Sequence, residues 1–110
     1  MLSVATGIAL AGAGTAAAQL APPRFAAPNL TPAGVRALAA NCAQCHGTDG
    51  RPVAGSEVPR LAGRDRAELL ARLTAFKQGS VRATVMDQIA KGYSDEELAA
   101  LADYFARLPR

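Results

Sequence analysis

The run Cys42-Ala43-Gln44-Cys45-His46 is the part of this sequence with the most specific chemistry. Two thiols three positions apart can each form a thioether with one of the two vinyl groups on an edge of haem, and the C-x-x-C-H pattern is typical of that attachment. The next residue, His46, would then lie under the iron, where a ring nitrogen can act as a ligand. The motif therefore predicts one covalently bound haem c, attached through Cys42 and Cys45, with His46 as a metal ligand.

Two other uses of a Cys-x-x-Cys pair fit this chain less well. A thioredoxin-like dithiol belongs in an alternation of strands and helices, and no window here shows the period-two pattern of a strand. A zinc site needs four ligands, and the chain has no cysteine or histidine beyond Cys42, Cys45 and His46. Haem attachment is therefore favoured over both alternatives and over a chance match.

A second axial ligand is usual for iron in an electron carrier, and methionine is a common one. Of the two methionines, Met1 lies in an apolar leader, which leaves Met86. The loop over residues 79–84 could bring its sulfur across the haem. We therefore predict Met86 as the second metal ligand, against the alternatives of a space-filling core methionine and an open five-coordinate iron. The reserve ligands are Lys77 and Lys91.

Helices are the elements expected to position these residues. Thr31 followed by Pro32 is typical of a cap with proline at the first helical position. Ser94 with Glu97 forms a capping-box pattern, and glycine follows two other apolar periodic segments. We expect helices over about 32–42 or beyond, 64–78, 85–91 and 95–107, with a loop over 47–60.

The first 18 residues carry no charge and end in Ala16-Ala17-Ala18, which is typical of a signal peptide and its cleavage site. No Lys or Arg precedes the apolar run, so a start upstream of Met1 stays an alternative, as does an uncleaved anchor. We expect residues 1–18 to be a signal peptide that directs export to the periplasm. Residues 19–30, with three prolines, are expected to form an extended leader to a domain over 31–110.

Composition fits a single small domain that needs help to fold. The 110 residues are 50% hydrophobic, yet they include no tryptophan and only five aromatic side chains. A domain of this size buries a marginal core and often depends on a cofactor, metal or disulfide. The net charge of +3 is mild and the arginines are scattered, so no nucleic acid partner is predicted, and no firm membrane association either.

Together these features resemble the class I c-type cytochromes over about residues 31–109. Members place a glycine eight positions and a bulky residue four positions before the first haem cysteine, here Gly34 and Leu38. Their last helix carries an apolar pattern that is matched here by Leu101, Tyr104 and Phe105. The resemblance implies an all-α class I cytochrome c fold, with four or so helices around one covalently bound haem. It also implies an electron-transfer protein rather than an enzyme.

The resemblance also implies further residues around the haem. Family members have a proline after the haem motif whose carbonyl accepts the proton on the free histidine nitrogen. Pro59 fits that place, and such a bond orients the histidine and raises its basicity; the alternative for Pro59 is an ordinary loop residue. Pro59, Leu61 and Tyr104 are the residues expected to contact the haem in addition to the motif.

Three stretches, residues 58–63, 73–79 and 84–97, resemble two groups within the family. One is the cytochrome subunit of flavocytochrome c sulfide dehydrogenase, and the other is one half of a dihaem cytochrome c4. The main expectation is a monohaem carrier of single electrons in the bacterial periplasm, with transient redox partners. The alternatives are a haem subunit that accepts electrons from a flavoprotein dehydrogenase and, in a different class, an open-site haem sensor or catalyst. A docking patch could be flanked by Arg51, Arg60, Arg64 and Lys77; the alternative is that these cations are ordinary solvated surface charges.

Overall fold

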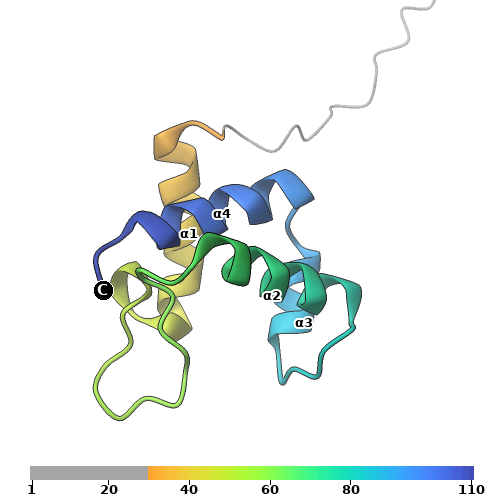
Figure 1. Ribbon diagram of the computed structural model, residues 1–110, viewed down its shortest axis with the longest axis horizontal. Helices are drawn as coiled ribbons and strands as arrows, with labels where there is room; N and C mark the ends of the chain where they lie inside the picture. Colours follow the sequence, from red (N-terminus) through yellow and green to blue (C-terminus); the bar gives the residue numbers. More distant parts are fainter. Residues whose placement is uncertain (1–29) are drawn as a thin grey trace, which may run out of the picture.

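The computed structural model describes residues 30–110, which form helices and loops with no strand among them (Figure 1). The elements are α1 (Pro32–His46), the 3-10 turn η1 (Thr48–Gly50), α2 (Arg66–Gln78), α3 (Met86–Lys91) and α4 (Asp95–Arg107). The predicted all-α class is thus confirmed. The predicted signal peptide, and the leader up to residue 29, lie outside this described part. Within it, no helix has the length and hydropathy needed to cross a bilayer.

Local capping sets the start of α1. The Thr31 side chain accepts a hydrogen bond from the backbone N–H of Gly34 at 3.1 Å, and Pro32 occupies the first turn. Both features satisfy or avoid the unpaired N–H groups at a helix start. The helix continues past Cys42 to His46, so the whole C-x-x-C-H motif lies on its last turns.

The middle helices begin slightly later than the sequence predicts. Residue Asp65 caps α2, because its carboxylate accepts the backbone N–H of Glu68 at 2.9 Å, so the helix begins at Arg66 and not at Arg64. Helix α3 begins at Met86, one residue after Val85, which gives no side-chain cap. The predicted stop of α2 is confirmed, since Gly79 has the left-handed conformation (φ 73°) that glycine adopts at low cost.

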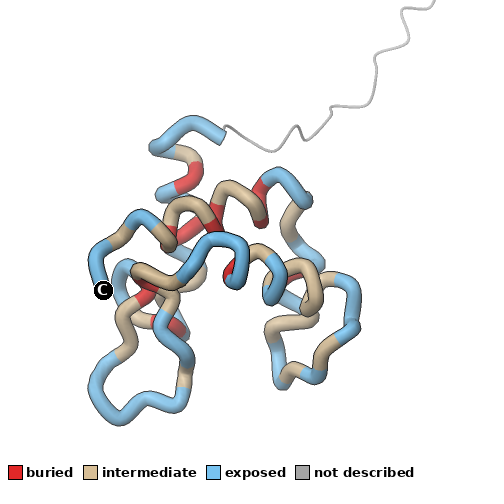
Figure 2. Tube along the Cα trace, viewed as in Figure 1, coloured by how far each residue is buried: buried red, intermediate tan, exposed pale blue. Residues whose placement is uncertain are grey.

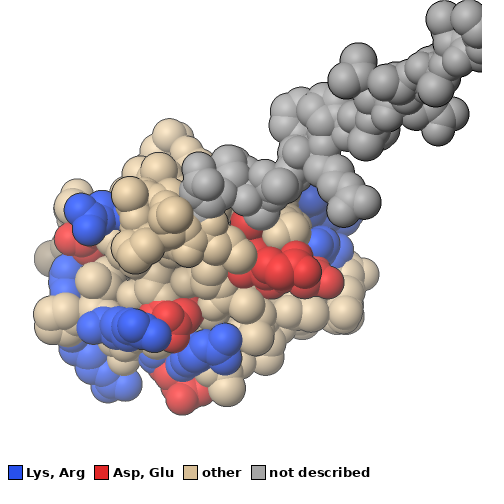
Figure 3. All heavy atoms as spheres, turned by 90° about the horizontal axis from the view of Figure 1, so that it is seen from above, with Lys and Arg blue, Asp and Glu red and all other residues tan. Residues whose placement is uncertain are grey.

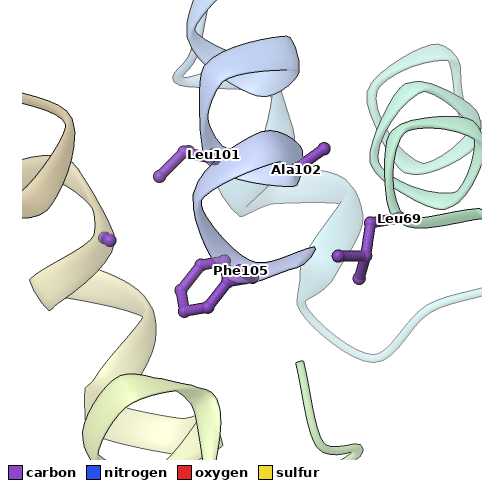
Figure 4. Close-up of a cluster of buried hydrophobic side chains, with 5 residues drawn as sticks. Leu69, Leu101, Ala102 and Phe105 are labelled. Carbon is purple, nitrogen blue, oxygen red and sulfur yellow. The ribbon is translucent and has the colours of Figure 1, made fainter. Parts of the chain in front are cut away.

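Helices α1 and α2 pack against α4. This helix contacts α1 on one side and α2 on the other, and α2 also packs against α3 (Figure 1). In Figure 4, Leu101 and Phe105 point from α4 toward α1, while Leu69 reaches in from α2. Buried positions lie where these helices face one another, and the connecting loops are largely exposed (Figure 2).

The start of α4 allows a direct test of its capping box. Ser94 Oγ accepts the Glu97 N–H at 3.1 Å, and the Glu97 carboxylate accepts the Ser94 N–H at 2.8 Å. We expect Ser94→Ala to lower the free energy of unfolding by about 1 kcal/mol, measured by urea unfolding followed by circular dichroism. Ser80→Ala removes an exposed hydroxyl outside any helix start, whose only hydrogen bond is a 3.2 Å solvent-exposed one to the Ala75 carbonyl. It is expected to change the free energy of unfolding by less than about 0.5 kcal/mol. Equal losses in the two variants would rule out the cap.

Candidate haem-binding site

The last turns of α1 hold the three motif residues in different environments. Cys42 is half-buried and packs against the core, Cys45 is exposed, and the two are not joined in a disulfide. His46 is only 9% exposed. Because residues three apart on a helix lie on the same side, the two thiols can meet one edge of the same flat ligand.

Burial affects the chemistry of Cys42. Desolvation raises the pKa of its thiol, more than a hydrogen bond from its own backbone lowers it. A raised pKa means that the ionised sulfur is disfavoured at this position. A thioether carries no charge and does not titrate, so covalent attachment suits this half-buried sulfur.

The imidazole of His46 is oriented by a backbone carbonyl. His46 Nδ1 lies 2.7 Å from the carbonyl oxygen of Pro59, a distance at which the ring N–H donates to the carbonyl. This is the hydrogen bond that the sequence resemblance implies. With the proton held on Nδ1, Nε2 keeps its lone pair and is the nitrogen that can bind a metal.

Backbone hydrogen bonds close the loop that carries Pro59. The carbonyl oxygen of Gly50 accepts from the N–H groups of both Leu61 (2.9 Å) and Ala62 (3.2 Å). The two ends of residues 51–60 are therefore fastened together directly after η1. This closure brings the Pro59 carbonyl back to the end of α1, thirteen residues after His46.

Gly50 makes that closure possible. It is buried, with φ +71°, and a Cβ added to it would lie 2.8 Å from Leu61 Cβ and 2.9 Å from the ring of Phe105. Any side chain would thus push the loop off α4. Leu61 itself is half-buried and packs against the core cluster.

The other predicted site residues lie on α4 and α3. The Tyr104 hydroxyl is 3.4 Å from Asp49 Oδ1, and its ring meets that of Phe105 edge-on, with centroids 5.2 Å apart. Met86 is the first residue of α3 and is half-buried. Its role and the haem contacts of Leu61 and Tyr104 stay predictions, because they concern the bound cofactor.

The two reserve ligands differ in their surroundings. Lys91 is exposed at the end of α3. Lys77 is engaged elsewhere, because its Nζ donates to the carbonyl of Tyr93 and to Asp95 Oδ1, both at 2.8 Å. An ammonium held in this way is a poor candidate for an iron ligand.

The predicted docking cations are mostly paired within the chain. Arg51 donates to the Pro109 carbonyl and Arg64 pairs with Glu68. Lys77 is occupied as above, whereas Arg60 is exposed. Figure 3 shows basic and acidic side chains interspersed on one face, without a large area of a single sign. These pairs support the alternative that the cations are ordinary surface charges.

Sequence reasoning missed two contributions to this site. Gly47 (φ 80°) and Gly50 (φ 71°) both need positive φ, and the signal was present in the glycines that flank Thr48-Asp49 directly after the motif. The bonds from Lys77 to Tyr93 and Asp95 had no local signal, because their partners lie 16 and 18 residues away.

The hydrophobic core is small, which bears on whether the chain could hold a large apolar cofactor. In the described part, nine apolar residues are buried and four of them are alanine. Many larger side chains are only partly buried against this core, including Leu38, Leu70 and Leu73. A core this small is marginal by itself, so an additional apolar body next to the motif fits it.

Comparisons with known proteins identify relatives of this chain. Residues 29–105 match the family model described as "Cytochrome C oxidase, cbb3-type, subunit III". The cytochrome subunit of sulfide dehydrogenase of Chlorobaculum tepidum is 41% identical over 73 residues, which cover 66% of this chain and 64% of that protein. Cytochrome c-553 of Nitratidesulfovibrio vulgaris is 37% identical over 75 residues, or 66% of this chain and 74% of that protein.

A longer relative matches over a smaller share of its length. Cytochrome c4 of Pseudomonas aeruginosa is 38% identical over 71 residues, covering 64% of this chain and 35% of that protein. The chain thus spans a little under two thirds of the sulfide dehydrogenase subunit and about a third of the cytochrome c4. The family-model match, residues 29–105, contains the Cys-x-x-Cys-His motif, helices α1 to α3 and all but the last two residues of α4.

Proposed function

Since this chain is a class I c-type cytochrome that carries covalently bound haem c, we propose that it transfers single electrons between other redox proteins. It is an electron-transfer protein rather than an enzyme in itself. Haem iron, when bound, supplies the one-electron chemistry, and the chain supplies ligands, orientation and an apolar surrounding. The apolar residues 1–18 support a periplasmic location.

One observation carries this proposal: the hydrogen bond from His46 Nδ1 to the Pro59 carbonyl. It fixes the imidazole at the end of the Cys-x-x-Cys helix with Nε2 free to bind iron. A histidine held by a second partner is a stronger and better oriented ligand. Cys42 and Cys45 would hold the haem by two thioethers, so that it stays bound in both oxidation states.

Met86 is the residue that we propose would bind the haem iron together with His46. It is half-buried, and it is the sole methionine of the cytochrome domain. A sulfur ligand opposite histidine raises the reduction potential. If Met86 and His46 both bound the iron, no site would be open to small molecules, and the protein would act as a carrier rather than as a sensor or catalyst.

The visible absorption spectrum of the purified protein tests the proposal directly. We expect sharp low-spin bands in the reduced form and a weak far-red sulfur-to-iron band in the oxidised form. Both follow from His46 and Met86 as axial ligands. A high-spin spectrum without the far-red band, together with rapid carbon monoxide binding, would instead support the sensor or catalyst alternative.

A second candidate function is that of a haem subunit in a flavoprotein complex. The 41% identity to the Chlorobaculum sulfide dehydrogenase cytochrome subunit favours it. Affinity purification of the exported protein from its native host tests it, because a subunit should retain a flavin-containing partner at stoichiometric amount. Recovery of a flavin-free monomer would leave the free-carrier function.

A further inference from the structure

Helix α3 is too short to hold its own position. It spans six residues, Met86–Lys91, and Val85 gives it no side-chain cap. Isolated helices below about 12–15 residues are marginal in water. The place of α3 therefore depends on contacts with the rest of the chain. Met86 is its first residue, so any displacement of the helix also moves this sulfur.

Lys77 makes a polar contact with the chain just beyond the far end of this helix. From α2, its Nζ donates to the carbonyl oxygen of Tyr93 at 2.8 Å. Tyr93 follows α3 closely, and its own N–H bonds back to the carbonyl of Ala90, a fully buried residue of α3. The Tyr93 hydroxyl also lies 3.5 Å from Asn41 Nδ2 on α1. Lys77 thus fastens the end of α3 to a longer helix.

The two bonds of Lys77 are unequal. Asp95, its ion-pair partner, has a side chain that is 85% exposed, and ion pairs in such positions contribute little. The Lys77 side chain is 29% exposed and meets the Tyr93 carbonyl in a part-buried setting. A hydrogen bond from a charged donor is stronger than a neutral one. The bond to Tyr93 is therefore the one that matters for α3.

We propose that Lys77 is a positioning residue that holds Met86 at the iron by fixing the end of α3. This rests on the proposed function, since it presupposes Met86 as a ligand. Without the Lys77 bond, the fraction of molecules in which α3 has moved away should rise. An added ligand that competes with Met86 then binds more tightly, because its apparent affinity is proportional to that fraction.

Imidazole titration of the oxidised holoprotein, followed by loss of the far-red band, measures this directly. We expect Lys77→Ala to bind imidazole on the order of tenfold more tightly than the wild type. Lys77→Arg, which keeps the charge and the donors, should stay within about twofold. The matched control is Arg72→Gln, which removes an exposed cation from the same helix and should leave the affinity unchanged.

The outcomes separate the two proposals. Unchanged imidazole affinity in Lys77→Ala, with the far-red band intact, overturns the role of Lys77 and leaves Met86 as ligand. Absence of the band from the wild type overturns both. A general structural role for Lys77 predicts a lower urea midpoint with unchanged imidazole affinity, and this result too would overturn the proposal. If Lys77→Ala does not accumulate as holoprotein, Lys77→Gln takes its place, with a shift of a few-fold expected.

Discussion

Replacement of Met86 by alanine is expected to abolish the far-red band of the oxidised protein and to lower its reduction potential by on the order of 0.1 V. Axial ligands shift haem potentials over a range of about 0.8 V, and a methionine opposite histidine raises the potential. Without the Met86 sulfur, the iron would also have an open site, so the variant should bind carbon monoxide rapidly when reduced. Spectroscopy and a redox titration of the same sample measure all three effects.

Two variants on α3 serve as controls for this result. Ile89→Ala removes a 39% exposed apolar side chain without removing a sulfur, and it should keep the band and the potential. Lys91→Ala removes the exposed reserve ligand and should do the same. Unchanged spectra in Met86→Ala would contradict methionine ligation. Loss of the low-spin spectrum in Lys91→Ala would transfer the ligand role to that lysine.

Helix boundaries were largely predictable because the signals that set them are local. The Thr31 cap, the Gly79 stop and the Ser94–Glu97 capping box each involve residues within one turn. The start of α2 was misplaced by two residues although Asp65 and Glu68 also stand three apart. The sequence pattern alone does not distinguish a residue inside the first turn from one just before it. The hydrogen bond from the Glu68 N–H to the Asp65 carboxylate identifies Asp65 as the cap and Arg66 as the first helical residue.

Some residues of the site could be predicted from local sequence, and others depend on contacts between distant parts of the chain. Cys42, Cys45 and His46 are recognisable from spacing, because attachment chemistry fixes their order along one helix. Pro59 needed a family resemblance, since its carbonyl reaches His46 only after the loop closes on Gly50. The Lys77–Tyr93 bond joins α2 to the short connection between α3 and α4, sixteen residues further along the chain. No pattern within one segment predicts it.

Gly47 carries the second large expected effect. Its backbone (φ 80°, ψ 164°) lies in a region that essentially only glycine adopts. A Cβ there would lie 2.5 Å from the carbonyl carbon of Arg51, closer still to its oxygen, and 2.7 Å from Pro52 Cα. These are backbone atoms, which cannot rotate away as a side chain can. We expect Gly47→Ala to lower the free energy of unfolding by about 4 kcal/mol, from backbone strain and loop displacement together.

Gly55→Ala is the control that separates the steric clash at Gly47 from the cost of a positive φ. Gly55 has nearly the same φ, 82°, but a Cβ there would meet nothing within 4 Å. The expected cost is therefore that of a left-handed backbone alone, about 1–2 kcal/mol. Urea unfolding of both holoproteins gives the difference, and equal losses would show that the contact with Arg51 and Pro52 does not constrain the turn.

Natural domains are stable by only about 5–15 kcal/mol. A loss of 4 kcal/mol directly after His46 should thus also reduce the yield of holoprotein, because the loop that brings the Pro59 carbonyl to the imidazole begins at this glycine.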